Sequence, residues 1–127
     1  MAVNGEGGAV AVLVVDDQEL FRGITCALVG VVPGWRVVAE AASGEEGVIL
    51  ARQIRPAVVL MDVYLPGING IEATRRIIAG DPTVNVLLMS SYAVEDLPPG
   101  ADDCGAAGYI RKDDLTPAIL LELSRRS

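Results

Sequence analysis

Residues able to carry out chemistry follow four of the five apolar segments that we interpret as strands. They are Asp16 and Asp17 after the first segment, Asp62 at the end of the third, Ser90 after the fourth and Lys112 just beyond the fifth. Because the carboxyl ends of parallel strands meet at one edge of a sheet, we expect these side chains to lie together. A single polar residue at a strand end is common, but four strands with such residues at the same end indicate a site.

The three carboxylates define the chemistry of this predicted site. Like charges a few ångströms apart repel by about 4 kcal/mol per pair at an effective dielectric of about 20, so they protonate or recruit a cation. An all-oxygen cluster favours Mg²⁺ or Mn²⁺. A carboxylate nucleophile beside a divalent ion, a hydroxyl and an ammonium can accept a phosphoryl group. Asp62 is the candidate nucleophile, and the product would be an aspartyl phosphate.

Strand-like and helix-like segments alternate along the chain. This pattern predicts an α/β fold, a doubly wound five-stranded parallel sheet of order 2-1-3-4-5 with helices on both faces. The expected strands are 9–15, 36–41, 58–62, 84–89 and 106–110. The expected helices are 18–30, 43–54, 70–79 and 116–126.

Local signals support the predicted helices. Ser43 and Glu46 form a capping box, in which each side chain is expected to bond the other residue's backbone N–H, and Asn69 with Glu72 resembles a second. In the first helix four apolar residues lie roughly on one face: Leu20, Ile24, Ala27 and Leu28. Pro98-Pro99-Gly100 stands where a fourth helix would be expected, so we predict that this helix is broken or shortened.

Composition limits the possible functions. The 127 residues suit one domain, with residues 1–8 a loose Gly-rich tail and 9–127 the folded unit. A net charge of −7 opposes contact with nucleic acid, and no apolar run approaches the about 20 residues of a membrane span. We expect a cytoplasmic protein with reduced Cys26 and Cys104. The absence of histidine from the sequence excludes histidine-based catalysis within the chain.

The chain resembles a response-regulator receiver domain over about residues 10–123. The motifs that carry the resemblance are Asp16-Asp17, Asp62 with Pro66 and Gly70, Ser90-Ser91, and Gly108-Tyr109-Ile110-Arg111-Lys112. The resemblance implies the flavodoxin-like receiver fold and a regulatory role in two-component signal transduction, without conventional enzyme activity. A sensor histidine kinase would phosphorylate Asp62. Residues 16–20 and 67–74 most resemble LuxR/NarL-type receivers, which are joined to helix-turn-helix domains that regulate transcription.

The same resemblance implies a magnesium site. Asp16 and Asp17 would hold Mg²⁺ together with Asp62 and the backbone carbonyl of Tyr64.

It also implies roles in switching. Ser90 would contact the phosphoryl group, Lys112 would pair with it, and Tyr109 would be an aromatic switch that turns inward when Ser90 moves. Tyr64 and Tyr92 would flank the path of the hydrolytic water and set the lifetime of the phosphoryl group.

The chain ends right after the last predicted helix, so we expect either a stand-alone receiver or one separated from its output domain. A homodimer could form through the face that receivers build from the fourth helix, fifth strand and fifth helix. Leu120 and Leu121 are candidates to face a partner.

Two other classes of protein are open on the sequence. A haloacid-dehalogenase-like phosphatase shares the nucleophile, Mg²⁺, hydroxyl and lysine, but it needs a second aspartate two residues after the nucleophile, where this chain has Tyr64. A phosphate-independent interaction module of the same fold would answer a partner or a small ligand. The complete acidic and lysine set argues against that module, whereas the broken fourth helix favours it.

Overall fold

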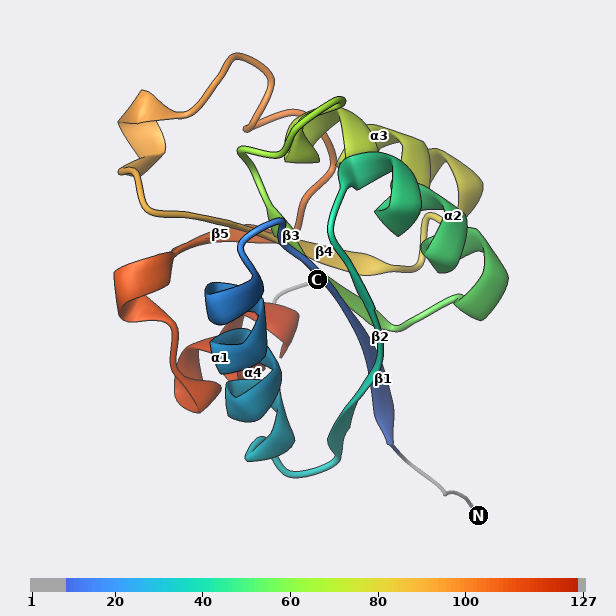
Figure 1. Ribbon diagram of the computed structural model, residues 1–127, viewed down its shortest axis with the longest axis vertical. Helices are drawn as coiled ribbons and strands as arrows, with labels where there is room; N and C mark the ends of the chain where they lie inside the picture. Colours follow the sequence, from blue (N-terminus) through green and yellow to red (C-terminus); the bar gives the residue numbers. More distant parts are fainter. Residues whose placement is uncertain (1–8, 126–127) are drawn as a thin grey trace.

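The computed structural model describes residues 9–125, so the predicted tail at 1–8 and the predicted helix end at Arg126 lie outside the described residues. Five parallel strands form one sheet in the order β2-β1-β3-β4-β5 (Figure 1). They are β1 (Val10–Val15), β2 (Trp35–Ala41), β3 (Val58–Asp62), β4 (Asn85–Ser90) and β5 (Gly108–Arg111). The helices are α1 (Glu19–Gly30), α2 (Gly44–Ile54), α3 (Gly70–Gly80) and α4 (Pro117–Arg125). The predicted fold class and strand order are confirmed.

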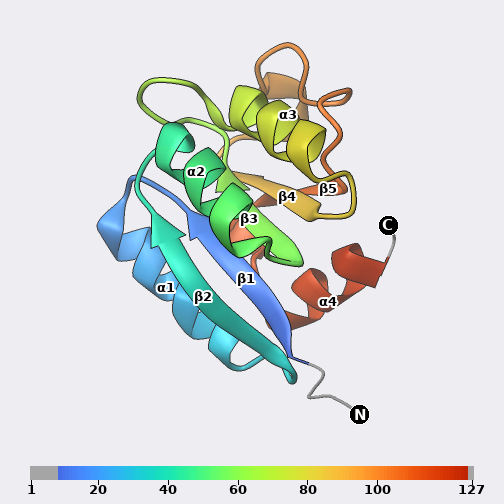
Figure 2. The same ribbon diagram turned by 90° about the vertical axis from the view of Figure 1, so that its right-hand side faces the viewer.

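The sheet is covered on both faces, with α2 and α3 on one side and α1 and α4 on the other (Figure 2). Each face of the sheet has its own hydrophobic core, and successive side chains of β1 point alternately into one core and the other. Leu13 and Val15 belong to the core under α2 and α3, whereas Val12 and Val14 belong to the core under α1 and α4. Strands buried on both faces need continuous apolar sequence, which explains the unbroken runs. Among the described helices, none combines the length and apolar character needed to cross a membrane.

The core-facing side of α1 differs from the face identified in the sequence. Leu20 is 81% exposed and Ile24 is 46% exposed, whereas Thr25 and Val29 are fully buried beside the partly buried Phe21. Apolar residues surround most of this helix, so periodicity alone does not decide which stripe is buried. Packing against the sheet selects the stripe at 21, 25 and 29, and leaves an apolar face in solvent.

The expectation for Leu120 as a partner-facing residue is wrong. Its side chain is fully buried in the core between α4 and the sheet, together with Leu60 and Leu87. Leu121 is partly buried and packs on the same core. The helix begins at Pro117 with Thr116 capping the N–H of Ile119, and this start turns position 120 toward the sheet.

Both predicted caps form, one of them with a different partner. The Ser43 hydroxyl accepts from the N–H of Glu46, but the Glu46 carboxylate accepts from Ala42 instead of Ser43. Asn69 accepts from the N–H of Glu72. The bond to Ser43 fixes the start of α2, and the bond to Asn69 fixes the start of α3.

The segment between β4 and β5 contains no α-helix, as predicted. After the single 3-10 turn η1 (Val94–Asp96) the backbone is extended at Leu97 and passes through Pro98-Pro99 into a turn at Gly100, where φ is +94°. The segment loops away from the sheet in Figure 1, in light to dark orange. We refer to residues 91–107 as the irregular segment.

Candidate functional site

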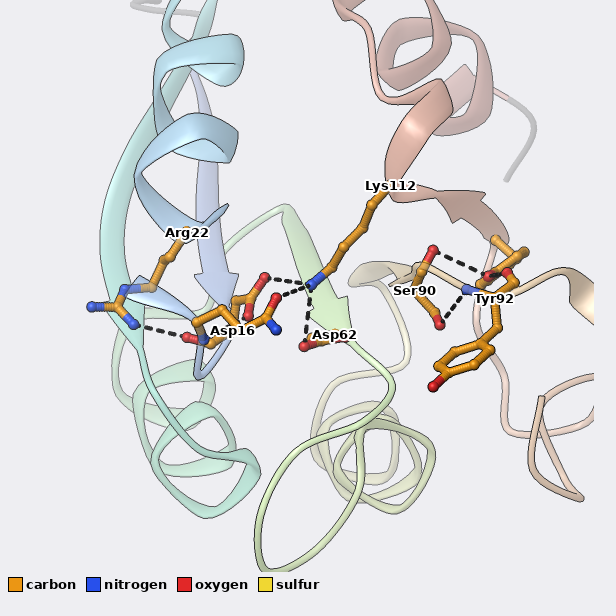
Figure 3. Close-up of polar contacts among 8 residues, drawn as sticks. Asp16, Arg22, Asp62, Ser90, Tyr92 and Lys112 are labelled. Atoms are coloured by element: carbon orange, nitrogen blue, oxygen red, sulfur yellow. Dashed lines mark hydrogen bonds and ion pairs between the residues drawn. The ribbon is translucent and has the colours of Figure 1, made fainter. Parts of the chain in front are cut away.

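The carboxyl ends of the strands bring the predicted site residues together. Asp16 follows β1, Asp62 ends β3 and Ser90 ends β4, and all three are at most 4% exposed. Lys112 begins the 3-10 turn η2 (Lys112–Asp114) directly after β5. Figure 3 shows its side chain reaching across to the two aspartates. The predicted convergence of these strand ends on one edge of the sheet is confirmed.

The Lys112 ammonium lies between two buried carboxylates. Its Nζ is 3.1 Å from Oδ2 of Asp16 and 3.5 Å from Oδ2 of Asp62, and its side chain is 7% exposed. An ammonium so nearly withdrawn from water is stabilised by the two negative charges around it. Lys112 therefore offsets the charge of both aspartates.

The acidic cluster fits a divalent cation. Asp16, Asp17 and Asp62 each offer one carboxylate oxygen, and these three oxygens lie within 4.8 Å of one another. Asp17 is exposed, so solvent reaches the cluster on its side. Mg²⁺ prefers oxygen ligands and retains several waters, which suits a cluster open on one side. The backbone carbonyl of Tyr64 as a further ligand stays a prediction.

The environment of Asp62 alters its acidity. Burial, followed by the negative charge of Asp16, raises the pKa of Asp62 from 3.8 to about 7, although Lys112 acts in the opposite direction. Without a cation, this carboxyl therefore holds its proton to a higher pH than an ordinary aspartate does. A divalent cation favours the ionised form, so we expect cation binding to release a proton here.

The loop after Asp62 is held by close backbone packing. A Cβ at Gly70 would lie 2.0 Å from the carbonyl oxygen of Asp62, so only glycine lets α3 begin there. The N–H of Gly70 donates to the carbonyl of Val63 at 2.8 Å. From α2, the Glu45 carboxylate accepts from the N–H of Ile68 at 3.1 Å. These contacts fix the backbone that carries the candidate nucleophile.

Three tyrosines connect the site to the irregular segment. The Tyr109 hydroxyl donates to the carbonyls of Ser90 and Tyr92, while the Ser90 hydroxyl accepts from the N–H of Tyr92 at 3.1 Å. The Tyr64 ring meets the Tyr92 ring edge-on at 5.0 Å, and its hydroxyl donates to the carbonyl of Asp96 at 3.0 Å. We call Tyr64, Tyr92 and Tyr109 the tyrosine cluster. Burial raises the pKa of Tyr109 above its ordinary value of 10.0.

Three residues of α1 and its cap contribute contacts that the sequence did not reveal. The Gln18 side-chain oxygen accepts from the Lys112 ammonium at 3.2 Å, and that ammonium lies 4.4 Å from the centre of the Phe21 ring. Arg22 donates to the carbonyl of Asp16 at 2.8 Å. The position of Gln18 directly after the aspartate pair was the only available signal. Phe21 and Arg22 could not be placed before the orientation of α1 was known.

Comparison with known proteins identifies a family. Residues 12–123 match the model of the response regulator receiver domain. The chain is 44% identical over 104 residues to the response regulator GacA of Pseudomonas protegens, covering 81% of this chain and 48% of that protein. It is 39% identical over 103 residues to the response regulator UvrY of Escherichia coli, covering 81% and 47%. The chain thus spans about half the length of these curated relatives.

Solved structures agree with the sequence relatives. A LuxR-family two-component response regulator from Aurantimonas is 36% identical with a TM-score of 0.81, over 91% of this chain and 81% of that one. The signal receiver domain of a putative NarL from Mycobacterium tuberculosis is 28% identical with a TM-score of 0.82, over 92% and 97%. The match to the family model over residues 12–123 shows that this protein belongs to the response-regulator receiver family.

Proposed function

We propose that Asp62 is the phosphoacceptor of a two-component signalling pathway, with a sensor histidine kinase as donor. The observation that carries this proposal is the Lys112 ammonium, held between Asp16 and Asp62 beside an oxygen cluster suited to Mg²⁺. A nucleophile, a cation and a metal site within one edge of a sheet are the parts that phosphoryl transfer requires.

In the transfer, an Asp62 carboxylate oxygen attacks the phosphorus of a phosphohistidine, and the bond from phosphorus to the imidazole nitrogen breaks. The product is an aspartyl phosphate and a free histidine on the kinase. Lys112 moves from the carboxylate to a phosphoryl oxygen, and the Ser90 hydroxyl donates to another. Asp16, Asp17, Asp62 and the backbone carbonyl of Tyr64 would hold Mg²⁺, which would supply charge neutralisation at this edge of the sheet.

The kinase must approach from a side that gives access to Asp62. The exposed face of α1, with Leu20 and Ile24 in solvent, begins directly after Asp17 and the Gln18 cap. An apolar face beside a reactive group is suited to docking a partner helix. We place the kinase contact on this face.

Phosphorylation then alters the distal face. A phosphoryl group adds about −1.5 to −2 charge. When the Ser90 hydroxyl closes on it, that hydroxyl gives up the bond it accepts from the N–H of Tyr92, whose carbonyl is one of the two acceptors of the Tyr109 hydroxyl. Reorientation of Tyr109 changes the face formed by the irregular segment, β5 and α4. Homodimerisation through this face, and control of transcription through a helix-turn-helix output domain, are the consequences we propose for a receiver domain spanning residues 9–127.

A phosphatase of the haloacid-dehalogenase type is less well supported. Its general acid would have to stand at the position of Tyr64, and the Tyr64 hydroxyl donates to the backbone carbonyl of Asp96. The role we propose is therefore regulatory, with phosphotransfer and dephosphorylation limited to the chain's own Asp62.

Intact-mass measurement with acetyl phosphate tests the proposal. Wild type should gain one phosphoryl group in Mg²⁺ and none in EDTA, and Asp62→Asn should gain none. Asp102→Asn, an exposed aspartate of the irregular segment, is the matched control and should behave as wild type. Equal labelling of Asp62→Asn and wild type would refute the assignment.

A further inference from the structure

The irregular segment covers a cavity that the phosphorylation site does not use. It has a volume of about 570 Å³, within the range of small-molecule sites of about 300–1,000 Å³. Its lining comes from β4, β5 and the irregular segment.

The cavity exists because the segment that covers it cannot pack as a helix. Pro98-Pro99 removes two backbone donors and holds the chain extended after η1, and Gly100 turns it back at a φ of +94°. A helix at this place would lay an apolar stripe directly on the sheet. Here a loop spans the same face and leaves space above Leu88.

The lining has an apolar floor and an acidic rim. Leu88 is 1% exposed at the floor, and Leu97, Ala101 and the Tyr109 ring provide further apolar surface. Glu95 and Asp102 are the charged residues of the lining, and no basic residue is among them.

The neighbouring cation is already engaged. Arg75 approaches the backbone of Gly100, but its guanidinium pairs with Asp103 at 3.4 Å and Glu72 at 3.7 Å. The charge at the cavity is therefore negative, which agrees with the chain's net charge of −7. A ligand with a cationic group is favoured over an anionic one of the same shape.

We propose that this cavity is a binding site for a small organic amine with an apolar body. The body lies on Leu97, Ala101 and the Tyr109 ring, and the ammonium pairs with Glu95 and Asp102. The Tyr109 ring, which lines the cavity, offers an aromatic face to the same cation.

The position of Tyr109 couples the cavity to the acidic edge of the sheet. Its ring lines the cavity while its hydroxyl donates to the carbonyls of Ser90 and Tyr92. A bound amine holds the ring and the irregular segment in this arrangement and so opposes phosphorylation. This coupling rests on the proposed function of Asp62, whereas the amine site itself does not.

Three probes of one shape test the site: 4-phenylbutylamine, 4-phenylbutanol and 4-phenylbutanoate, titrated into the ¹⁵N-labelled chain. The amine should bind about tenfold more tightly than the carboxylate, with the alcohol between them, and should shift the amide signals of Leu97, Ala101 and Ala106. Equal affinity for amine and carboxylate, or shifts confined to residues outside the lining, would overturn the proposal.

Substitutions distinguish the effect of the carboxylate charges from the effect of the cavity's shape. Glu95→Gln with Asp102→Asn should weaken amine binding about fivefold and leave the alcohol unchanged. Glu19→Gln with Asp113→Asn removes the same charge from exposed positions outside the cavity and should leave the amine affinity as it was. Val94→Trp, at a rim residue that is 62% exposed, should fill the entrance and weaken all three probes without unfolding the chain. If the Glu95/Asp102 double variant and the Glu19/Asp113 double variant weaken amine binding equally, the carboxylates of Glu95 and Asp102 do not select the amine.

The coupling has its own readout. By reciprocity, Mg²⁺ with beryllofluoride bound at Asp62 should weaken amine binding about threefold, by the same factor that the amine weakens the phosphate mimic. An unchanged amine affinity would refute the coupling. Asp62→Asn should still bind the amine, so failure of the phosphoacceptor and failure of the cavity site give different results.

Discussion

The Nζ atom of Lys112 lies 3.1 Å from Oδ2 of Asp16, although 96 positions separate the two residues in the chain. The same ammonium lies 3.5 Å from Asp62 and 3.2 Å from the side-chain oxygen of Gln18. A buried ammonium with such partners can neutralise one negative group and transfer to another that develops nearby. This arrangement underlies the proposed transfer of a phosphoryl group to Asp62.

Removal of the Lys112 ammonium should slow phosphorylation. Lys112→Ala leaves the phosphoryl charge without its cation, and we expect acetyl phosphate labelling to slow about 100-fold. Arg111→Ala is the matched control, because Arg111 is an exposed neighbour paired with Asp113, and its rate should stay within about twofold of wild type. Labelling of Lys112→Ala at the wild-type rate would remove Lys112 from the mechanism.

The raised pKa of Asp62 predicts how stability depends on pH without Mg²⁺. The folded chain retains a proton that the unfolded chain loses, because the pKa rises from 3.8 to about 7. The stability this contributes is complete below about pH 4 and is lost as the pH rises through about 7. Asp62→Asn keeps a neutral side chain at every pH, so its free energy of unfolding minus that of wild type should increase with pH.

Urea unfolding in EDTA at pH 5 and pH 8 measures this effect. The difference in free energy of unfolding between Asp62→Asn and wild type should be larger at pH 8 by about 2 kcal/mol. Because Asp62 interacts with Asp16 and Lys112, the difference between the two chains reports the titration of Asp62 together with its effect on these two partners. The same difference at both pH values would show that the pKa of Asp62 is ordinary.

Much of the fold follows from local sequence. Strands buried on both faces need continuous apolar runs, and a side-chain cap such as Asn69 acts within three residues, so both are visible in sequence. Parallel topology then aligns the carboxyl ends of the strands, which is why the convergence of Asp16, Asp62 and Lys112 could be predicted.

The remaining features depend on packing between distant segments. Leu20 and Phe21 are both apolar, and only the angle at which α1 meets the sheet decides that Phe21 turns inward to the Lys112 ammonium. The prolines at 98 and 99 exclude a helix, but they do not specify the path of the loop. The cavity and the bond from Tyr64 to Asp96 therefore became visible only in three dimensions.

Two glycine-to-alanine substitutions should have opposite effects. Gly70→Ala places a methyl group against the Asp62 carbonyl, where the Cβ distance would be 2.0 Å, and should lower the free energy of unfolding by about 2 kcal/mol or more. Gly23→Ala, in α1 with nothing within 4 Å of its Cβ, should raise it by about 0.5–1 kcal/mol. Thermal unfolding of both variants is the measurement. Equal stability of the two would contradict the packing described around Asp62.

The tyrosine cluster should govern how long the phosphoryl group survives. Tyr64 and Tyr92, with ring centres 5.0 Å apart, flank the expected route of water to Asp62. Tyr64→Asn and Tyr92→Ala should each shorten the lifetime of the phosphorylated chain about tenfold, measured by loss of the phosphorylated mass after acetyl phosphate is removed. Val94→Ala, an exposed change in the same segment, should leave it unaltered. Unchanged lifetimes in both tyrosine variants would show that the rings do not shield the site.

The most direct test of the central claim is to locate the phosphoryl group. Borohydride reduces an aspartyl phosphate to homoserine, so the chain is phosphorylated with acetyl phosphate and Mg²⁺, reduced, digested and sequenced by mass spectrometry. We predict homoserine at position 62 and unmodified aspartate at 16 and 17. Homoserine at Asp16 or Asp17, or an unmodified Asp62 in a chain that has taken up phosphate, would contradict the account.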